Sequence, residues 1–195
     1  MPRFVSYISG VCYDIGCTGQ TVYVYDKNGT ELAKLRDLKY AYYVAISPLG
    51  DIFAVKSADG RLAVYSFETL ALVKKFRFSG VKCAQDDGFC FMGDGKYFIN
   101  VERQGDDLHS AISVYDVADF SVVSQFLLGD GMMAEDIGEI DGELYVLGFY
   151  RDADMTLTGR FIAKYKDGVI SEAVNITDNE YESYLEALAK RRNGK

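Results

Sequence analysis

Closely spaced acidic residues are the side chains of this sequence with the clearest capacity for chemistry. Paired carboxylates can serve as general acid and base, and they can bind a divalent cation such as Ca²⁺. The one histidine follows two of these acids and has the pKa range of a general base. The residues concerned are Asp86, Asp87, Asp106, Asp107, His109, Glu135, Asp136, Asp152 and Asp154.

None of the motifs that would fix a particular reaction accompanies these acids. The sequence has no phosphate-binding loop, no G-x-S-x-G, no H-E-x-x-H and no complete EF-hand loop. Its four cysteines (Cys12, Cys17, Cys83 and Cys90) are not spaced like zinc ligands, so we expect thiols, most of them buried. The sequence therefore predicts no catalytic residue, no metal site and no cofactor.

The composition is that of a folded, acidic protein. The 195 residues carry a formal charge of -8, and 49% of them are hydrophobic, which excludes a disordered chain. The charge disfavours nucleic acid and anionic membranes as partners, and it favours a basic protein or a cation. Because the first residues lack the apolar core of a signal peptide, we expect a cytoplasmic location with reduced thiols.

An internal repeat indicates the elements that must position the acids. Four segments rich in β-branched and aromatic residues each contain a tyrosine near the end, at Tyr25, Tyr65, Tyr115 and Tyr165. Such segments are typical of strands. A turn and a second apolar segment follow each one, and two further strands around a tight turn separate consecutive units. A four-stranded antiparallel unit repeated every 40 to 50 residues or so has the length of a propeller blade.

Three short motifs resemble those of WD-repeat and YVTN-like β-propellers. Residues 46–50 (Ile-Ser-Pro-Leu-Gly) resemble the F-S-P-x-G turn of these families, while Val64-Tyr65 and Val114-Tyr115-Asp116 stand where the families have V-W-D or V-Y-D. The resemblance implies an all-β fold, a small β-propeller-like array of about four four-stranded antiparallel blades. The chain has no Trp, so the His–Ser–Trp network of WD repeats is absent and a divergent propeller is expected.

Blade counting leaves the closure of the ring open. Residues 3–15 contain two apolar runs, 4–8 and 11–15, which we expect to be the first two strands of the first blade. Four such blades form a closed ring, a half-ring that dimerises into an eight-bladed ring, or an open array. A homodimer is expected if the ring is half-formed.

A C-terminal α-helix is predicted after the repeats. Thr177 and Glu180 have the spacing of a capping box, and an apolar stripe follows at Tyr181, Tyr184, Leu185 and Leu188. We therefore divide the chain into a propeller-like domain, residues 1–176, and an amphipathic helix with a basic tail, residues 177–195. The helix is expected to be a brace packed on the sheet edges, with docking into a partner's groove as the alternative.

The longer loops of these blades are expected on one face, which is where binding sites concentrate. The acids above lie on this acidic long-loop face, together with Tyr40, Tyr42 and Met132. The sequence thus predicts a non-catalytic protein-interaction or scaffold module for a protein partner, a basic one in view of the charge. The alternative is a ligand- or cation-binding propeller, including a hydrolase, with its site at the channel mouth. An enzyme should raise the pKa of one of two converging acids.

Overall fold

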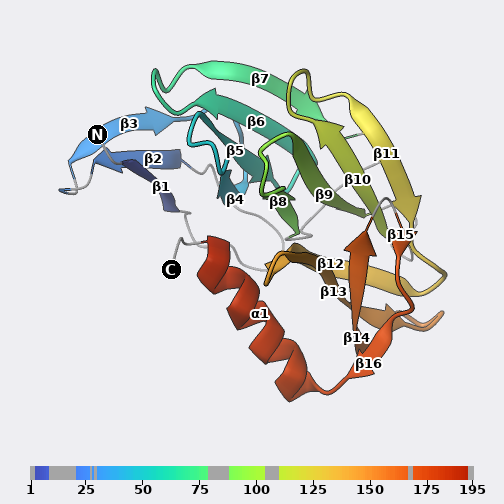
Figure 1. Cartoon of the computed structure of the whole chain (residues 1–195). Coiled ribbons are helices and arrows are strands. Elements are labelled where there is room, and N and C mark those ends of the chain that lie inside the picture. The colour runs from blue at the N-terminus through green and yellow to red at the C-terminus, as the bar shows by residue number, and fades with distance from the viewer. Residues whose placement is uncertain are drawn as a thin grey trace. The chain divides into compact units, whose positions relative to one another are not determined.

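The computed structural model describes residues 3–8, 21–26, 28, 30–78, 88–103, 110–166 and 169–192. Its contacts divide the chain into two compact units, unit 1 (Met1–Gln85) and unit 2 (Asp86–Lys195). Each unit holds two antiparallel sheets, and the described chain is mostly strand, with one helix at its C-terminal end (Figure 1). The all-β class and the C-terminal helix predicted from the sequence are confirmed.

Unit 1 contains a three-stranded and a four-stranded sheet. The first sheet has the order β1-β2-β3 and consists of β1 (Arg3–Ile8), β2 (Thr21–Asp26) and β3 (Glu31–Leu35). The second has the order β4-β5-β6-β7 and consists of β4 (Ala41–Ile46), β5 (Ile52–Ser57), β6 (Arg61–Ser66) and β7 (Leu72–Arg77). Their facing sides share one apolar core, which includes Val24, Phe53 and Tyr65.

Unit 2 contains the other two sheets and the helix. The third sheet has the order β11-β10-β9-β8 and consists of β8 (Phe89–Phe91), β9 (Tyr97–Arg103), β10 (Ser110–Asp116) and β11 (Val122–Leu127). The fourth consists of β12 (Met132–Ile140), β13 (Glu143–Arg151), β14 (Leu157–Lys166), β15 (Val169–Ile170) and β16 (Val174–Ile176). The helix α1 (Asp178–Arg192) follows directly.

The register of the sheets reproduces the repeat found in the sequence. Each repeat tyrosine lies opposite an apolar residue of the preceding strand, in the pairs Phe4–Tyr25, Phe53–Tyr65, Phe98–Tyr115 and Leu144–Tyr165. In the first three sheets the pairing with the outer strand shifts by one residue at the Val-Tyr step, as in a β-bulge. The same local sequence therefore produces the same local geometry in both units.

The environments of the four tyrosines differ at the first repeat. Tyr65, Tyr115 and Tyr165 are buried, whereas Tyr25 is half-buried and stacks on Tyr23 at 6.2 Å between ring centroids. Successive side chains of β2 point to opposite faces of the sheet. Val22 and Val24 face the core of unit 1, so Tyr25 faces away from it. The four tyrosines therefore share their position in the strand register, but only three of them share a buried environment.

Two strand predictions need correction. Phe4–Ile8 was expected to be the first strand of its blade, but β1 pairs directly with β2 and so takes the place of the second strand. The expected strand at 11–15 lies outside the described residues. In the last sheet, the second apolar segment expected after the repeat tyrosine is divided into two short strands, β15 and β16, and both pair with β14.

Helix α1 covers one face of the fourth sheet (Figure 1). Tyr181 and Leu188 are buried against Leu147 and Ile162, while the opposite face of the sheet joins the core shared with the third sheet. The predicted capping box is present, since the Thr177 N–H donates to a Glu180 carboxylate oxygen at 2.8 Å and the Glu180 N–H to the Thr177 hydroxyl at 3.3 Å. The helix braces the sheet, but it packs on a face of the sheet and not on the sheet edges as expected. Another sheet could pack on this face only by displacing it.

Candidate interaction surface at the long-loop ends

In unit 2, the segments expected to form long loops meet at one end of the sheets. The Arg151 N–H donates to the Gly131 carbonyl at 2.8 Å, which ties the β13–β14 hairpin to the segment before β12. The Ala134 N–H donates to the Ser110 hydroxyl at 3.1 Å, which ties the beginning of β12 to the start of β10. Hydrogen bonds therefore join the described parts of these segments within this unit.

The hairpin between β13 and β14 has a tip held in one conformation. A single carboxylate oxygen of Asp152 accepts the N–H groups of Asp154 at 3.0 Å and Thr156 at 2.9 Å. The Met155 N–H donates to the Asp152 carbonyl at 3.0 Å. Asp152 is therefore the residue that closes this turn, as aspartate does in Asx turns. The acid spacing that suggested a Ca²⁺ ligand pair is explained by turn formation.

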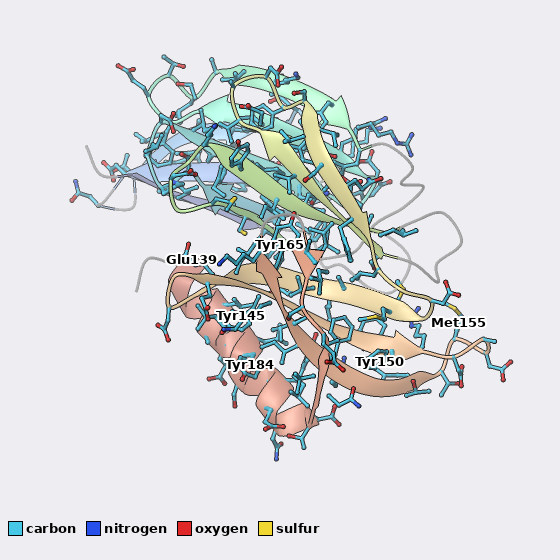
Figure 2. The ribbon with its side chains drawn as sticks, turned by 45° about the vertical axis from the view of Figure 1, so that its right-hand side comes forward. Glu139, Tyr145, Tyr150, Met155, Tyr165 and Tyr184 are labelled. Carbon is cyan, nitrogen blue, oxygen red and sulfur yellow. The ribbon has the colours of Figure 1, made fainter. Side chains whose placement is uncertain are left out.

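Met155 stands at this tip with an unusual backbone. Its φ is 63°, in the left-handed region that glycine adopts without strain, yet its side chain is 41% exposed. Figure 2 shows Met155 at the outer end of the hairpin, beyond Tyr150 and away from α1. Leu157, two residues on, is also exposed. The tip thus presents two apolar side chains next to the acid Asp154.

In unit 1, Tyr40 repeats this combination. Its φ is 57°, its side chain is 37% exposed, and its carbonyl accepts the Ala58 N–H at 3.0 Å, which fixes the loop before β4. Two other apolar residues with positive φ differ from it, because Phe120 is buried and Leu70 packs against the core of unit 1. Tyr40 and Met155 therefore hold a strained backbone without burial to compensate for it.

The remaining predicted residues are distributed as follows. Tyr42 is half-buried in β4 and makes an edge contact with Tyr43, and Met132 packs against the core of unit 2. Asp136 is only 4% exposed, and its carboxylate accepts the Ile137 N–H at 2.8 Å, so it is not a surface acid. Asp86, Asp87, Asp106, Asp107 and His109 lie outside the described residues.

Glu135 has its carboxylate engaged by α1 and β14. It accepts the Tyr181 hydroxyl, and the Arg160 guanidinium lies 3.6 Å away. Arg160 also lies over the Tyr181 ring, 4.4 Å from its centroid, and reaches Asp178 at 3.3 Å. Burial is the largest cause that raises the pKa of Tyr181, and the bond to Glu135 adds to it. These contacts make Glu135 an anchor for the helix.

The third sheet also contains a buried acid, Glu102. Glu102 is 1% exposed and accepts hydrogen bonds from the Tyr115 hydroxyl and from the Asn100 amide at 3.3 Å. Gln125 lies 3.5 Å from its other oxygen and donates to the Ser113 hydroxyl at 2.9 Å. The network joins three strands of the sheet through polar contacts.

The resolved pKa shifts of described carboxyl groups have structural causes. All are downward, and each comes first from a hydrogen bond to the charged form, given by Thr30 to Asp26, by Lys164 to Glu143 and by Thr177 to Glu180. In the described part of the chain, no three His, Cys, Asp or Glu side chains are grouped to hold a metal ion.

Comparison with known proteins shows the fold. No family model matches the sequence, and no curated protein matches it. Hydrazine synthase of Kuenenia stuttgartiensis matches with a TM-score of 0.69 and 14% identity, over 81% of this chain and 49% of that chain. Acylaminoacyl peptidase of Pyrococcus horikoshii matches with a TM-score of 0.58 and 15% identity, over 90% of this chain and 30% of that one.

An orthorhombic crystal form of the same peptidase gives a TM-score of 0.59 at 16% identity, over 88% of this chain and 31% of that one. The chain thus spans about half or a third of the length of these structures. At such identities the likeness concerns the fold alone. The chain has a propeller-like fold of four antiparallel sheets with a C-terminal helix. Within the described ranges, no helix has the length and apolar character needed to cross a bilayer.

Proposed function

We propose that this chain is a non-catalytic protein-interaction or scaffold module of the cytoplasm, built from divergent WD-repeat-like units. Its contact surface is the long-loop end, and its partner is a protein with a basic, partly apolar surface. The observation that carries the proposal is Met155, an exposed apolar side chain held at φ 63° on a turn that Asp152 closes.

Two physical arguments support this assignment. A non-glycine residue in the left-handed region costs about 1–2 kcal/mol, and strain of this kind persists at sites of function. Exposed methionine and leucine side chains on a fixed turn also suit the apolar centre of a protein interface, with acids at its rim. Tyr40 offers the same combination in unit 1.

Site-specific photocrosslinking tests the proposal. Benzoylphenylalanine replaces Met155 in one sample and Leu49, an exposed residue of the turn between β4 and β5, in a control sample. In extract of the native host, we expect a light-dependent adduct with one protein at position 155 and none with that protein at position 49. The adduct should weaken as salt is added, because the acidic surface attracts a basic partner.

Competition makes the test specific. Unlabelled wild-type protein should abolish the adduct, and Met155→Gly should compete at least about tenfold less well, as expected for loss of an interface anchor. The same adducts at positions 155 and 49, or equal competition by Met155→Gly, would contradict the proposed function.

A further inference from the structure

The strand β11 ends its sheet and carries no charge. Among the described residues, the order β11-β10-β9-β8 leaves its outer edge without a strand, and the sequence of Val122–Leu127 is Val-Val-Ser-Gln-Phe-Leu. Val123 is 53% and Leu127 58% exposed. An uncharged edge strand with exposed aliphatic side chains is a template for pairing with another strand.

Hydrogen bonding to β10 defines which residues of β11 face outward. The Leu128 N–H donates to the Ser110 carbonyl at 2.9 Å, and the antiparallel register continues with Phe126 opposite Ile112. Because hydrogen-bonded pairs alternate along an antiparallel ladder, Gln125 and Leu127 direct their N–H and C=O groups away from β10. The register shift lies between Val122 and Ser124, so it affects only the start of the strand.

The equivalent strand of unit 1 shows how such an edge is protected. Val122 lies opposite Tyr115 as Leu72 lies opposite Tyr65, so the two outer strands align residue by residue. The sequence of β7 is Leu-Val-Lys-Lys-Phe-Arg, with cations where β11 has serine, glutamine and leucine. β3 likewise contains Glu31 and Lys34. Charges on an edge strand oppose pairing, and β11 lacks them.

We propose that β11 pairs antiparallel with β11 of a second copy of this chain, around a two-fold axis. The register places Gln125 opposite Leu127 of the second copy, because this arrangement uses both outward-facing residues and avoids the bulge. Each of the two symmetric pairs exchanges both main-chain hydrogen bonds. A neutral strand meets its own copy without repulsion, whereas β7 would place Lys and Arg against Lys and Arg.

The pairing surface is one short strand, so the dimer should be weak and reversible. Sedimentation equilibrium of the full chain across the micromolar range should give a mass that approaches twice 21.7 kDa as concentration rises. Leu127→Arg introduces the residue that β7 has at this position and should raise the dimer Kd by more than about tenfold. Val73→Lys, a charge added to the exposed outer strand of unit 1, should leave the Kd unchanged.

A disulfide test reports the register independently of affinity. In a hydrogen-bonded antiparallel pair the Cα atoms are about 5.5 Å apart, which a disulfide can span. The double variant Gln125→Cys/Leu127→Cys should therefore form a covalent dimer on mild oxidation, beyond any formed by the wild type. The equivalent pair on β7, Lys75→Cys/Arg77→Cys, should not.

Each of the following results would overturn the proposal. These are a monomer at every concentration, a dimer that Leu127→Arg leaves intact, and a folded double-cysteine variant that fails to cross-link. The proposal would also be refuted if a different protein binds the β11 edge and the chain does not associate with itself.

Discussion

Replacing Met155 by glycine and by alanine separates backbone strain from the side chain. Both variants lose the thioether, but only glycine relieves the strain of a φ of 63°. The relief is about 1–2 kcal/mol, and the extra freedom of glycine in the unfolded chain offsets roughly 0.5–1 kcal/mol of it. We therefore expect the free energy of unfolding of Met155→Gly to exceed that of Met155→Ala by about 0.5–1 kcal/mol.

Urea unfolding measures this difference through the midpoint and slope of each transition. Ala153 is a matched control, because it is an exposed residue of the same turn and has no positive φ. There the order should reverse, with alanine more stable than glycine by roughly 0.5–1 kcal/mol. If alanine is also the more stable residue at position 155, the turn does not hold Met155 in a strained conformation and the argument for the interaction surface fails.

Three further outcomes are expected. Thr177→Ala should lower stability by about 1 kcal/mol through loss of the helix cap, measured by urea unfolding. Because bonds from Thr177 lower the pKa of Glu180, the stability that this carboxylate adds is present at neutral pH. It should fade as pH falls below 4.5 in the wild type, and it should fade less in the variant, which keeps the bond from the Thr177 N–H but loses the one from the hydroxyl. Gly148→Ala should cost about 2–3 kcal/mol by the same measurement, since a Cβ there would lie 2.2 Å from the Met133 carbonyl oxygen. Cys90 should react with iodoacetamide far more slowly in native than in unfolded protein, followed by mass spectrometry, because burial foremost raises the pKa of its thiol to about 12.

Local patterns in the sequence predicted those features that depend on neighbouring residues. Strand composition and turn residues located the hairpins around Tyr65 and Tyr115, and the spacing of Thr177 and Glu180 located the start of α1. Strand order in the first sheet was wrong, because two apolar runs before β2 compete for one place and composition does not rank them. Which strands pair with each other depends on tertiary packing, and the alternation of apolar and polar residues within a strand does not specify this.

The candidate site was harder to predict, since its key properties arise from contacts distant in sequence or from backbone conformation. Glu135 meets Tyr181 across 46 positions, so its role as a helix anchor has no local signal. Met155 and Leu157 were missed because a methionine in a polar hairpin has no pattern of its own. One signal was available, because Asp152 and Thr156 repeat the spacing of Asp26 and Thr30, whose turn has the same hydrogen bonds.

Comparison between repeats separates what the fold requires from what it does not. Features shared by equivalent strands, such as the bulge at each Val-Tyr step, stabilise the sheets and carry no information about partners. Departures from the repeat that cost stability or leave an edge unprotected require another explanation. Met155 and the uncharged β11 are two such departures, at the hairpin tip and at the sheet edge. Because they involve different residues, Met155→Gly should leave the dimer intact, and Leu127→Arg should leave the adduct at position 155 unchanged.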